Sequence, residues 1–477
     1  MSISSNMLWS GSRLGFWSRA GMYASVYPGR TFATARRRGA WYRRAMSARV
    51  DSGVAFAAAL LLVLLAGVAA GQRRLTLKPG ESFETAIESL RPGDHLTVMP
   101  GRYEDAGRIS LSVKGTRLQP VVITGVPGGA ASKIVRPAGA KAQNTINVEG
   151  ATWVTIRHLE ITSNGGDGIN LSKRAAFITL EDLHIHHVDV GVNFRSDLNH
   201  ITVRRCHIHD TGQNGGTGEG LYVGCNRSKC IVRDCLIEAN WIHGTLASTQ
   251  GDGIEIKRGS HSNVVRDNVI HDTRYPGILL YGTDGKPRNV VEGNVIWGAR
   301  DSGIQCAADA VIRNNIVFAG EGTGFNSQPH QGVTPGNLEF VHNTIIGGAP
   351  AIRLAKWAGA KRLVFANNAV YATPGRLKIF GLKGVAFSGN VFQSPDRALP
   401  AHGWKPGDPS RDFVSVARRS LWPRRGSALG GAADPAFVVG RDFEGAERGG
   451  RRVAGAYSDV APRRTRWRPK PGFKPSR

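Results

Sequence analysis

The chain has 477 residues, of which 61 are glycine and 8% are aromatic. This length is too great for one small core, and a glycine-rich, aromatic-poor composition favours a turn-rich β architecture over a helical one. The formal net charge is +26, but basic residues concentrate in the two terminal segments. Charge in terminal segments is commonly solvated, so we expect no nucleic-acid partner.

Residues 54–70, VAFAAALLLVLLAGVAA, are apolar or small throughout. Read from Met46, a charged start, an apolar middle and a small-residue end are typical of a secretion signal. We therefore expect Met46 to be the true start and residues 1–71 to be a basic leader and signal. The mature protein would then be secreted or periplasmic. The alternative, a membrane anchor with a basic cytoplasmic side, would need an apolar run of about 20 residues.

Residues 82–90, SFETAIESL, predict a short amphipathic helix at the start of the folded part. From about residue 150 the sequence repeats, and units such as TVRRCHI, VVRDNVI and VIRNNIV recur 21 to 33 residues apart. A period of this size indicates stacked coils, each burying its apolar face against its neighbours. Asparagines stacked at one turn would hydrogen-bond along the axis. The turn position falls at Leu159, Leu183, Cys206, Cys235, Asn268, Asn294, Asn315, Asn343, Asn368 and Asn390.

The repeat resembles the right-handed parallel β-helix of the pectate-lyase-like superfamily, over roughly residues 75–400. The N-terminal end of the predicted solenoid, ESLRPGDHLTVMPGRYED followed by PVVITGVPGG, is similar to the first coils of secreted polysaccharide-active members. The resemblance implies an all-β fold: a right-handed parallel β-helix solenoid of about ten or more coils, with the short N-terminal helix capping its open end. We expect this solenoid over residues 72–400. Residues 401–477 would form a loosely packed closing region and a basic C-terminal tail.

A second strand in each coil, usually opened by glycine, predicts which side chains face outward. Its apolar positions would form an inner row, and the residues between them two outer rows. The inner row comprises Ile169, Val192, Leu221, Ile254, Ile278, Ile304, Phe325 and Ile352. One outer row contains Asn170, Asn193, Tyr222, Glu255, Leu279, Gln305, Asn326 and Arg353; the next contains Ser172, Arg195, Gly224, Lys257, Tyr281, Ala307 and Gln328.

Coils lie about 4.8 Å apart, so residues of one row on neighbouring coils should form one patch. Tyr222, Glu255 with Lys257, and Tyr281 would meet in this way, with Arg195 about 10 Å from Lys257. Polar and aromatic side chains suit a sugar chain, although a solvated β face favours the same residues. The predicted substrate-binding residues are Arg195, Tyr222, Arg258 and Gln305.

A third row precedes each glycine and contains Asp167, Glu219 and Asp252, with Glu255 two residues beyond the last glycine. Several hard oxygen ligands suit calcium, and carboxylates this close repel one another without a cation. Glu219, Asp252 and Glu255 are the predicted ligands of a possible calcium ion. In the alternative, Lys257, Arg258 and Arg233 neutralise these acids.

The stretch GDGIEIKRGSHSNVVRDN resembles the catalytic region of β-helix lyases that cleave alginate and chondroitin-type chains. The resemblance implies that Lys257 removes the C5 proton of a uronate. A lysine base must be neutral, so we expect Arg258 and Arg195 to lower its pKa. The family's partner arginine is replaced here by Tyr281, for which we predict the role of acid toward the glycosidic oxygen.

Histidines and cysteines supply further candidates. HIHD at 207–210 and IHD at 270–272 place His209, Glu238 and His271 on successive coils, either as an acid/base group or as polar turn residues. Cys206 and Cys235 share a turn position, which suits a disulfide or stacked thiols. Cys225 and Cys230 bracket the insertion NRSK and would staple it. Cys306 would be left over.

Together these patterns predict a monomeric, secreted or periplasmic β-helix protein that acts on an acidic polysaccharide by lyase-type β-elimination. Two alternatives stay open. The protein could bind glycan without catalysis. It could also be a hydrolase or epimerase, since hydrolysis needs two carboxylates about 5–10 Å apart, and Glu219, Asp252 and Glu255 would supply them.

Overall fold

The computed structural model describes residues 72–141, 143–247, 249–393, 395–459 and 467–475. The predicted leader, secretion signal and Met46 start lie outside these residues. Within the described ranges, the structure contains no helix with the length and apolar character that a membrane crossing requires.

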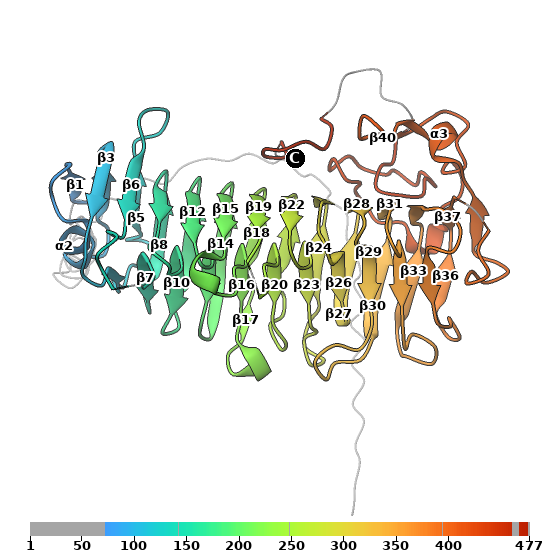
Figure 1. The fold of residues 1–477 in the computed structure, drawn as a ribbon, viewed down its shortest axis with the longest axis horizontal. Helices are drawn as coiled ribbons and strands as arrows, with labels where there is room; N and C mark the ends of the chain where they lie inside the picture. Colours follow the sequence, from blue (N-terminus) through green and yellow to red (C-terminus); the bar gives the residue numbers. More distant parts are fainter. Residues whose placement is uncertain (1–71, 142, 248, 394, 460–466, 476–477) are drawn as a thin grey trace, which may run out of the picture. The chain divides into compact units, whose positions relative to one another are not determined.

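The described chain winds through three parallel sheets, A, B and C, visiting them in the same order in coil after coil (Figure 1). Sheet A contains β1 (Arg74–Leu77), β2 (His95–Val98), β5 (Val121–Gly125), β8 (Thr152–Arg157), β11 (Ala176–Glu181), β14 (Leu198–Arg204), β17 (Val232–Arg233), β18 (Leu236–Glu238), β21 (Val264–Arg266), β24 (Asn289–Glu292), β27 (Ala308–Arg313), β30 (Gly336–Val341), β33 (Leu363–Ala366) and β36 (Ala386–Ser388).

Sheet B follows sheet A in each coil. It contains β3 (Gly101–Glu104), β6 (Ser132–Val135), β9 (Glu160–Thr162), β12 (His184–Val188), β15 (His207–Thr211), β19 (Trp241–Thr245), β22 (Val269–Thr273), β25 (Val295–Trp297), β28 (Ile316–Gly320), β31 (Thr344–Gly347), β34 (Ala369–Tyr371), β37 (Asn390–Phe392) and β38 (Trp404–Pro406).

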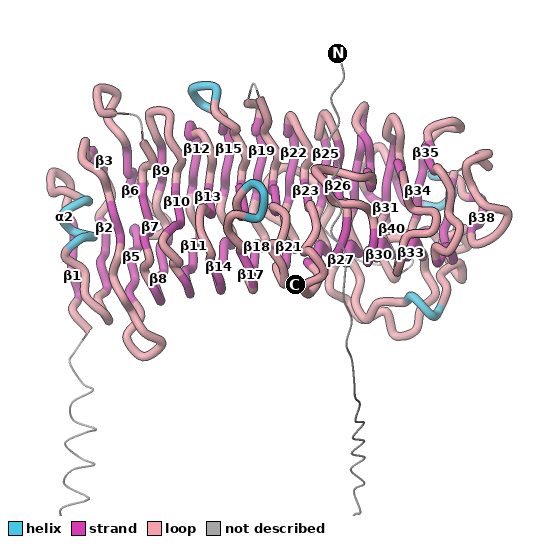
Figure 2. The backbone as a smooth tube through the Cα atoms, turned by 90° about the horizontal axis from the view of Figure 1, so that it is seen from below, coloured by secondary structure: helices cyan, strands magenta, loops and turns pink. Residues whose placement is uncertain are grey.

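Sheet C completes each coil and carries the predicted site. It contains β4 (Ser110–Leu111), β7 (Ile146–Glu149), β10 (Ile169–Ser172), β13 (Val192–Phe194), β16 (Leu221–Val223), β20 (Ile254–Ile256), β23 (Ile278–Leu280), β26 (Ser302–Cys306), β29 (Thr323–Ser327), β32 (Ile352–Leu354) and β35 (Leu377–Ile379). Loops at the sheet edges connect the strands (Figure 2), and two of them hold the short turns η1 (Gln213–Gly215) and η2 (Asn226–Ser228).

The inner row of sheet C has the predicted register. Ile169, Val192, Leu221, Ile254 and Ile278 are cross-strand partners in sequence order and are fully buried, and the pairing continues through Ile304, Phe325 and Ile352. Glycine opens these strands because coils approach closely there. A Cβ on Gly253 would lie 2.5 Å from the Gly277 carbonyl oxygen, a contact that no side chain tolerates. The prediction of an all-β, right-handed parallel β-helix is confirmed.

A single residue with positive φ turns the chain from sheet A into sheet B. From β8 to β37 this residue is His158, Asp182, Arg205, Ala239, Asp267, Gly293, Asn314, His342, Asn367 and Gly389. Glycine, Asn, Asp and His are the residue types that tolerate this backbone region best. The residue after it is buried in every coil, and from Asn240 onward it is always asparagine.

These buried asparagines form a ladder along the stack. From Asn268 onward, each Oδ1 accepts the backbone N–H of the asparagine one coil earlier at 2.9–3.0 Å. Each side-chain amide also donates to a backbone carbonyl of sheet A, as Asn294 does to Val265. The ladder comprises Asn240, Asn268, Asn294, Asn315, Asn343, Asn368 and Asn390, all with no exposed surface.

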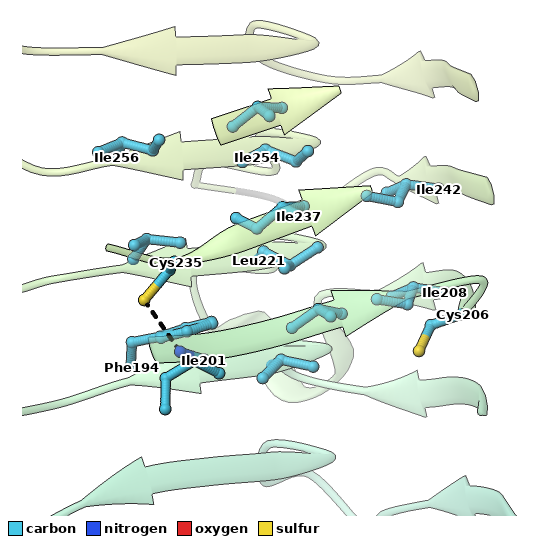
Figure 3. Packing of buried hydrophobic residues seen from close by; sticks show 14 of the residues in the cluster. Phe194, Ile201, Cys206, Ile208, Leu221, Cys235, Ile237, Ile242, Ile254 and Ile256 are labelled. Atoms are coloured by element: carbon cyan, nitrogen blue, oxygen red, sulfur yellow. Dashed lines mark hydrogen bonds between the residues drawn. The ribbon is translucent and has the colours of Figure 1, made fainter. Parts of the chain in front are cut away.

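The ladder corrects the predicted position of Cys235. Asn240, not Cys235, follows Cys206 in the row, because the Cys206 N–H donates to Asn240 Oδ1. Cys235 lies beside Ile201 at another bend of the coil (Figure 3), where Asp234 has the positive φ. Both bends have a positive-φ residue followed by a buried one, so their local sequences look alike.

The two ends of the stack are covered. Helix α2 (Phe83–Glu88) confirms the predicted cap helix, starts at the N-cap Ser82 and buries Phe83 and Ile87 in the solenoid core. At the other end lie α3 (Pro409–Asp412), the hairpin β39 (Phe413–Ser415) and β40 (Ser420–Pro423), and the turn η3 (Pro435–Phe437). Strand β38 extends the stack beyond residue 400.

The closing region is closely packed, not loosely packed as predicted. Phe413, Trp422, Phe443 and Tyr457 join a second apolar cluster against the outer face of sheet B. The buried Arg448 guanidinium donates to Asn314 Oδ1 and to several backbone carbonyls. Aromatic burial and the hydrogen bonds made by both terminal nitrogens of the buried Arg448 explain this order.

Candidate active site

Sheet C brings the predicted site residues together on neighbouring coils. Tyr222 pairs with Glu255, and the residues two positions further along extend the same register. Lys257 Nζ lies 4.6 Å from the ring centre of Tyr222 and 4.9 Å from that of Tyr281. The lysine is therefore held between aromatic rings of the preceding and the following coil, which favours its charged form.

Lys257 pairs with Glu255 inside this group. Its Nζ donates to Glu255 Oε1 at 2.5 Å, and the Tyr281 hydroxyl donates to the same oxygen at 2.8 Å. Lysine and glutamate are only 3% and 1% exposed. This patch is thus buried and is not the open outward face that strand alternation predicts.

The charge state of Lys257 differs from the prediction. Burial alone would lower its pKa, but the negative charge and hydrogen bond of Glu255 outweigh that effect and raise it. Arg258 does not act on it as predicted, because its guanidinium pairs with Asp284 at 2.7 Å. Arg195 lies two coils away, with its guanidinium 5.9 Å from the Tyr222 ring centre.

Three carboxylates converge beside this lysine. Oxygen atoms of Glu219, Asp252 and Glu255 lie within 4.8 Å of one another, and all three side chains are buried. Burial, reinforced by the charge of Glu255, raises the pKa of Glu219 to about 7. The same causes, with Glu219 added, raise the pKa of Asp252 well above its ordinary value.

The donor set fits a hard divalent cation. Glu219 Oε1, Asp252 Oδ1 and Glu255 Oε2 are buried and have no hydrogen-bond partner among the described residues. Buried acceptors without partners cost free energy, and like charges this close repel one another. Three carboxylates, each offering an unpaired oxygen, are the ligands that calcium prefers.

Two cavities flank Tyr281. One of about 330 Å³ is lined by Lys257, Arg258, Tyr281 and the 225–228 loop; another of about 250 Å³ is lined by Asp252, Glu255, Tyr281 and Gln305. Gln305 accepts a hydrogen bond from Asn326 on the next coil. Asp167 is separate from the three carboxylates, and its partners are Asn170 and Asn193.

His330 is a site residue that sequence reasoning missed. Its ring lies 4.9 Å from that of Tyr281 and lines the 250 Å³ cavity. Burial lowers its pKa, so the imidazole is neutral near pH 7. The residue comes from a loop without strand periodicity, so its place over the site had no signal in the repeat.

One of the cysteine predictions is confirmed and one alternative is wrong. Cys225 and Cys230 form the predicted disulfide around the η2 turn. Cys206 and Cys235 are buried free thiols, so the disulfide alternative is wrong for them, and Cys306 is also free. Burial raises the pKa of the Cys206 and Cys235 thiols to about 12.

The predicted histidine group is wrong in one member, for the same reason as Cys235. His243, not Glu238, lies between His209 and His271 on sheet B. Glu238 is on sheet A, where it pairs with Arg266. The observed row of His186, His209, His243 and His271 runs beside a second row of His184 and His207 that ends at Trp241.

The three parallel sheets and their coil-to-coil register define a right-handed parallel β-helix protein. Residues 139–287 match the family described as right handed beta helix region, and residues 242–370 match the one described as periplasmic copper-binding protein (NosD). The second match begins after residue 241, beyond four histidines of the two rows. No curated protein sequence matches the chain.

Solved structures with low sequence identity share this fold. Pectate lyase Pel9A superposes with a TM-score of 0.51 at 14% identity, covering 82% of this chain and 98% of that one. XylC, solved with xylose, gives 0.52 at 9% identity, covering 81% and 98%. Alginate lyase from Paenibacillus sp. str. FPU-7 gives 0.42 at 17% identity, covering 68% and 99%.

Proposed function

We propose that this protein binds an acidic polysaccharide along sheet C and cleaves it by β-elimination. The observation that carries the proposal is the buried contact of Lys257 with the Tyr281 hydroxyl, beside three carboxylates with unpaired oxygens and between two cavities. Abstraction of a proton next to a carboxylate needs a base, an acid and positive charge near the developing enolate. The site offers the base and the acid, together with ligands for a cation.

Each residue has a defined part in this reaction. Lys257 takes the C5 proton of a uronate, and the electron pair of that bond forms the C4–C5 double bond as the C4–oxygen bond breaks. Tyr281 gives its hydroxyl proton to the leaving oxygen; burial and the charge of Glu255 raise its pKa, so it carries that proton near pH 7. Arg195, Tyr222, Arg258 and Gln305 would contact the sugar chain around this point.

A divalent cation, calcium by ligand type, would be held by Glu219, Asp252 and Glu255 and would supply positive charge to the substrate carboxylate. Glu255 is both a ligand and the ion-pair partner of Lys257. If a cation bound the Glu255 carboxylate, the negative charge that raises the pKa of Lys257 would be neutralised, and the lysine would lose its proton more readily.

The test is ultraviolet absorbance, because β-elimination creates an unsaturated uronate and the other candidate functions do not. Mature protein would be mixed with a panel of uronate polysaccharides, with calcium and with chelator. We expect activity in wild type with calcium, a loss of at least about 100-fold in Lys257→Ala, and no change in Lys286→Ala, which removes an exposed lysine of the next loop.

Other products would assign a different function to the protein. New reducing ends without absorbance would indicate hydrolysis, and a changed uronate configuration without cleavage would indicate epimerisation. Saturable polysaccharide binding without any product would indicate a glycan-binding protein. An absorbance rise that Lys257→Ala retains would refute the role of this lysine.

We also propose a secreted or periplasmic location for the mature protein. The Cys225–Cys230 disulfide supports it, since such bonds persist in oxidising compartments.

A further inference from the structure

Six histidines of sheet B stack on one another across four consecutive coils, on a different sheet from the three carboxylates of the candidate site. They form two rows of parallel rings on β12, β15, β19 and β22. In one row, His186, His209, His243 and His271 have ring centres 4.8–5.0 Å apart. In the other, His184 and His207 lie 4.9 Å apart and Trp241 continues the row. We call these residues the histidine ladder.

Imidazole nitrogens from the two rows face each other. His184 Nε2 lies 2.8 Å from His209 Nε2, and His207 Nε2 lies 2.9 Å from His243 Nε2. Ligand nitrogens of His184, His207 and His209 all lie within 4.8 Å of one another, and His184 also belongs to a second such group with Glu160 and His186. Two nitrogens bound to one metal at about 2.0–2.1 Å and at right angles would be about 2.9 Å apart.

In two of the rings, a neighbouring aspartate contacts Nδ1 and thereby favours the tautomer whose Nε2 is unprotonated. Asp210 Oδ2 lies 2.8 Å from His209 Nδ1. A proton on Nδ1 leaves the Nε2 lone pair pointing at His184, which is how outer carboxylates orient histidine ligands in metal sites. His271 has the same arrangement with Asp272, but its Nε2 accepts the Trp241 indole N–H at 2.9 Å. His271 Nε2 is therefore already engaged and is left out of the candidate ligands.

We propose that His184, His207 and His209 bind a divalent transition-metal ion, with Cu²⁺ bound more tightly than Ni²⁺ or Zn²⁺. Imidazole nitrogens suit these ions, right-angled nitrogen pairs suit Cu²⁺ and Ni²⁺, and affinity commonly rises to a maximum at copper. The ladder is partly open to solvent, with the His209 side chain 15% exposed, so an ion can enter. Calcium would not compete, because it takes oxygen ligands.

The ladder is independent of the proposed lyase site. It lies on sheet B, whereas Glu219, Asp252 and Glu255 belong to sheet C and the residues that lead into it. The two sites also select different ions by ligand type. A failure of one proposal therefore leaves the other intact.

The test is equilibrium dialysis of tag-free protein against CuCl₂, NiCl₂ and ZnCl₂ in the presence of a weak competing chelator. Bound metal is counted by mass spectrometry, and the Cu²⁺ visible spectrum reports nitrogen ligands. We expect about one Cu²⁺ per chain in wild type and at least about a 10-fold weaker affinity in His184→Gln, which disrupts both nitrogen groups. Asp210→Asn, which frees the His209 tautomer, should weaken binding less.

Matched controls decide between this site and nonspecific binding. His402→Gln removes an exposed histidine outside the ladder and should bind Cu²⁺ like wild type. The pair Glu219→Gln and Asp252→Asn should also retain it. Far-ultraviolet circular dichroism checks the fold, and His209→Gln serves as a second ladder variant. Absence of competitive binding, or binding equal in wild type and both ladder variants, would refute the site and leave the ladder a purely aromatic stack.

Discussion

At the scale of single residues, charge balance in the candidate site depends on what the carboxylates contact. Lys257 is one cation against Glu219, Asp252 and Glu255, and it contacts only Glu255 directly. The remaining negative charge is unfavourable in a buried position unless a proton or a cation joins it. Protonation and cation binding are therefore alternatives at the same oxygens.

This competition makes stability depend on pH. The pKa of Glu219 is raised from an ordinary 4.5 to about 7. A raised folded-state pKa contributes stability that is complete below the unfolded value and is lost as pH rises toward the folded value. In chelator, wild type should therefore lose melting temperature across this window, and Glu219→Gln should lose less.

With calcium, and above about pH 7, wild type should instead be stabilised more than Glu219→Gln. At about pH 8 the ion should raise the melting temperature of wild type, and Glu219→Gln should respond less because it lacks one charged ligand. Differential scanning calorimetry in both buffers measures this, with the exposed Glu321→Gln as control. Parallel pH profiles for wild type and Glu219→Gln would contradict the assignment.

At the scale of elements, the asparagine ladder fastens each coil to the next. Asn294 Oδ1 accepts both the backbone N–H and the side-chain amide of Asn268, and its own amide donates to Val265 and to Asn315. None of these groups can reach water, because the ladder is fully buried. Each lost partner thus leaves a buried polar group unsatisfied.

Asn294→Ala should accordingly destabilise the protein strongly. One unsatisfied buried group costs about 1–3 kcal/mol, and this substitution leaves several. Urea unfolding should show a lower midpoint than wild type by an amount well beyond that of Asn199→Ala, a half-buried residue whose side chain contacts the ring of its neighbour His200. Equal midpoints for the two variants would show that the ladder is not a main source of stability.

At the scale of the whole described solenoid, the C-terminal segment binds coils distant in sequence. Lys474 Nζ donates to Asp267 Oδ1 at 2.6 Å and to the carbonyls of Gly293 and Phe443. Phe473 lies against Trp241 of sheet B. The segment thus connects the closing region to coils in the middle of the stack.

Removal of this contact should weaken the closing region. Lys474 is 4% exposed, and breaking a buried ion pair costs about 3–5 kcal/mol. Lys474→Met should lower the urea midpoint and make the closing region more sensitive to limited proteolysis. The exposed Lys470→Met is the matched control, and indistinguishable cleavage of the two variants would contradict the proposed role.

Regular strands made much of this architecture predictable. The residue rows of sheet C were predicted from strand alternation and from the glycines that open the strands, and the structure has the predicted register. Cys235 and Glu238 were misplaced because two bends of one coil share a positive-φ residue followed by a buried one. The Glu255 contact that reverses the pKa shift of Lys257, and the position of His330, depend on side-chain packing and on an irregular loop.

The bend between sheets A and B has a consequence for how such chains diverge. A single residue makes that bend in coil after coil, and the buried position after it is bonded to both neighbours from Asn268 to Asn368. An insertion there would break the stack, whereas the loops on either side of β16 and β20 already vary in length. Sequence change around the candidate site can therefore accumulate in those loops while the hydrogen-bonded bend stays constant.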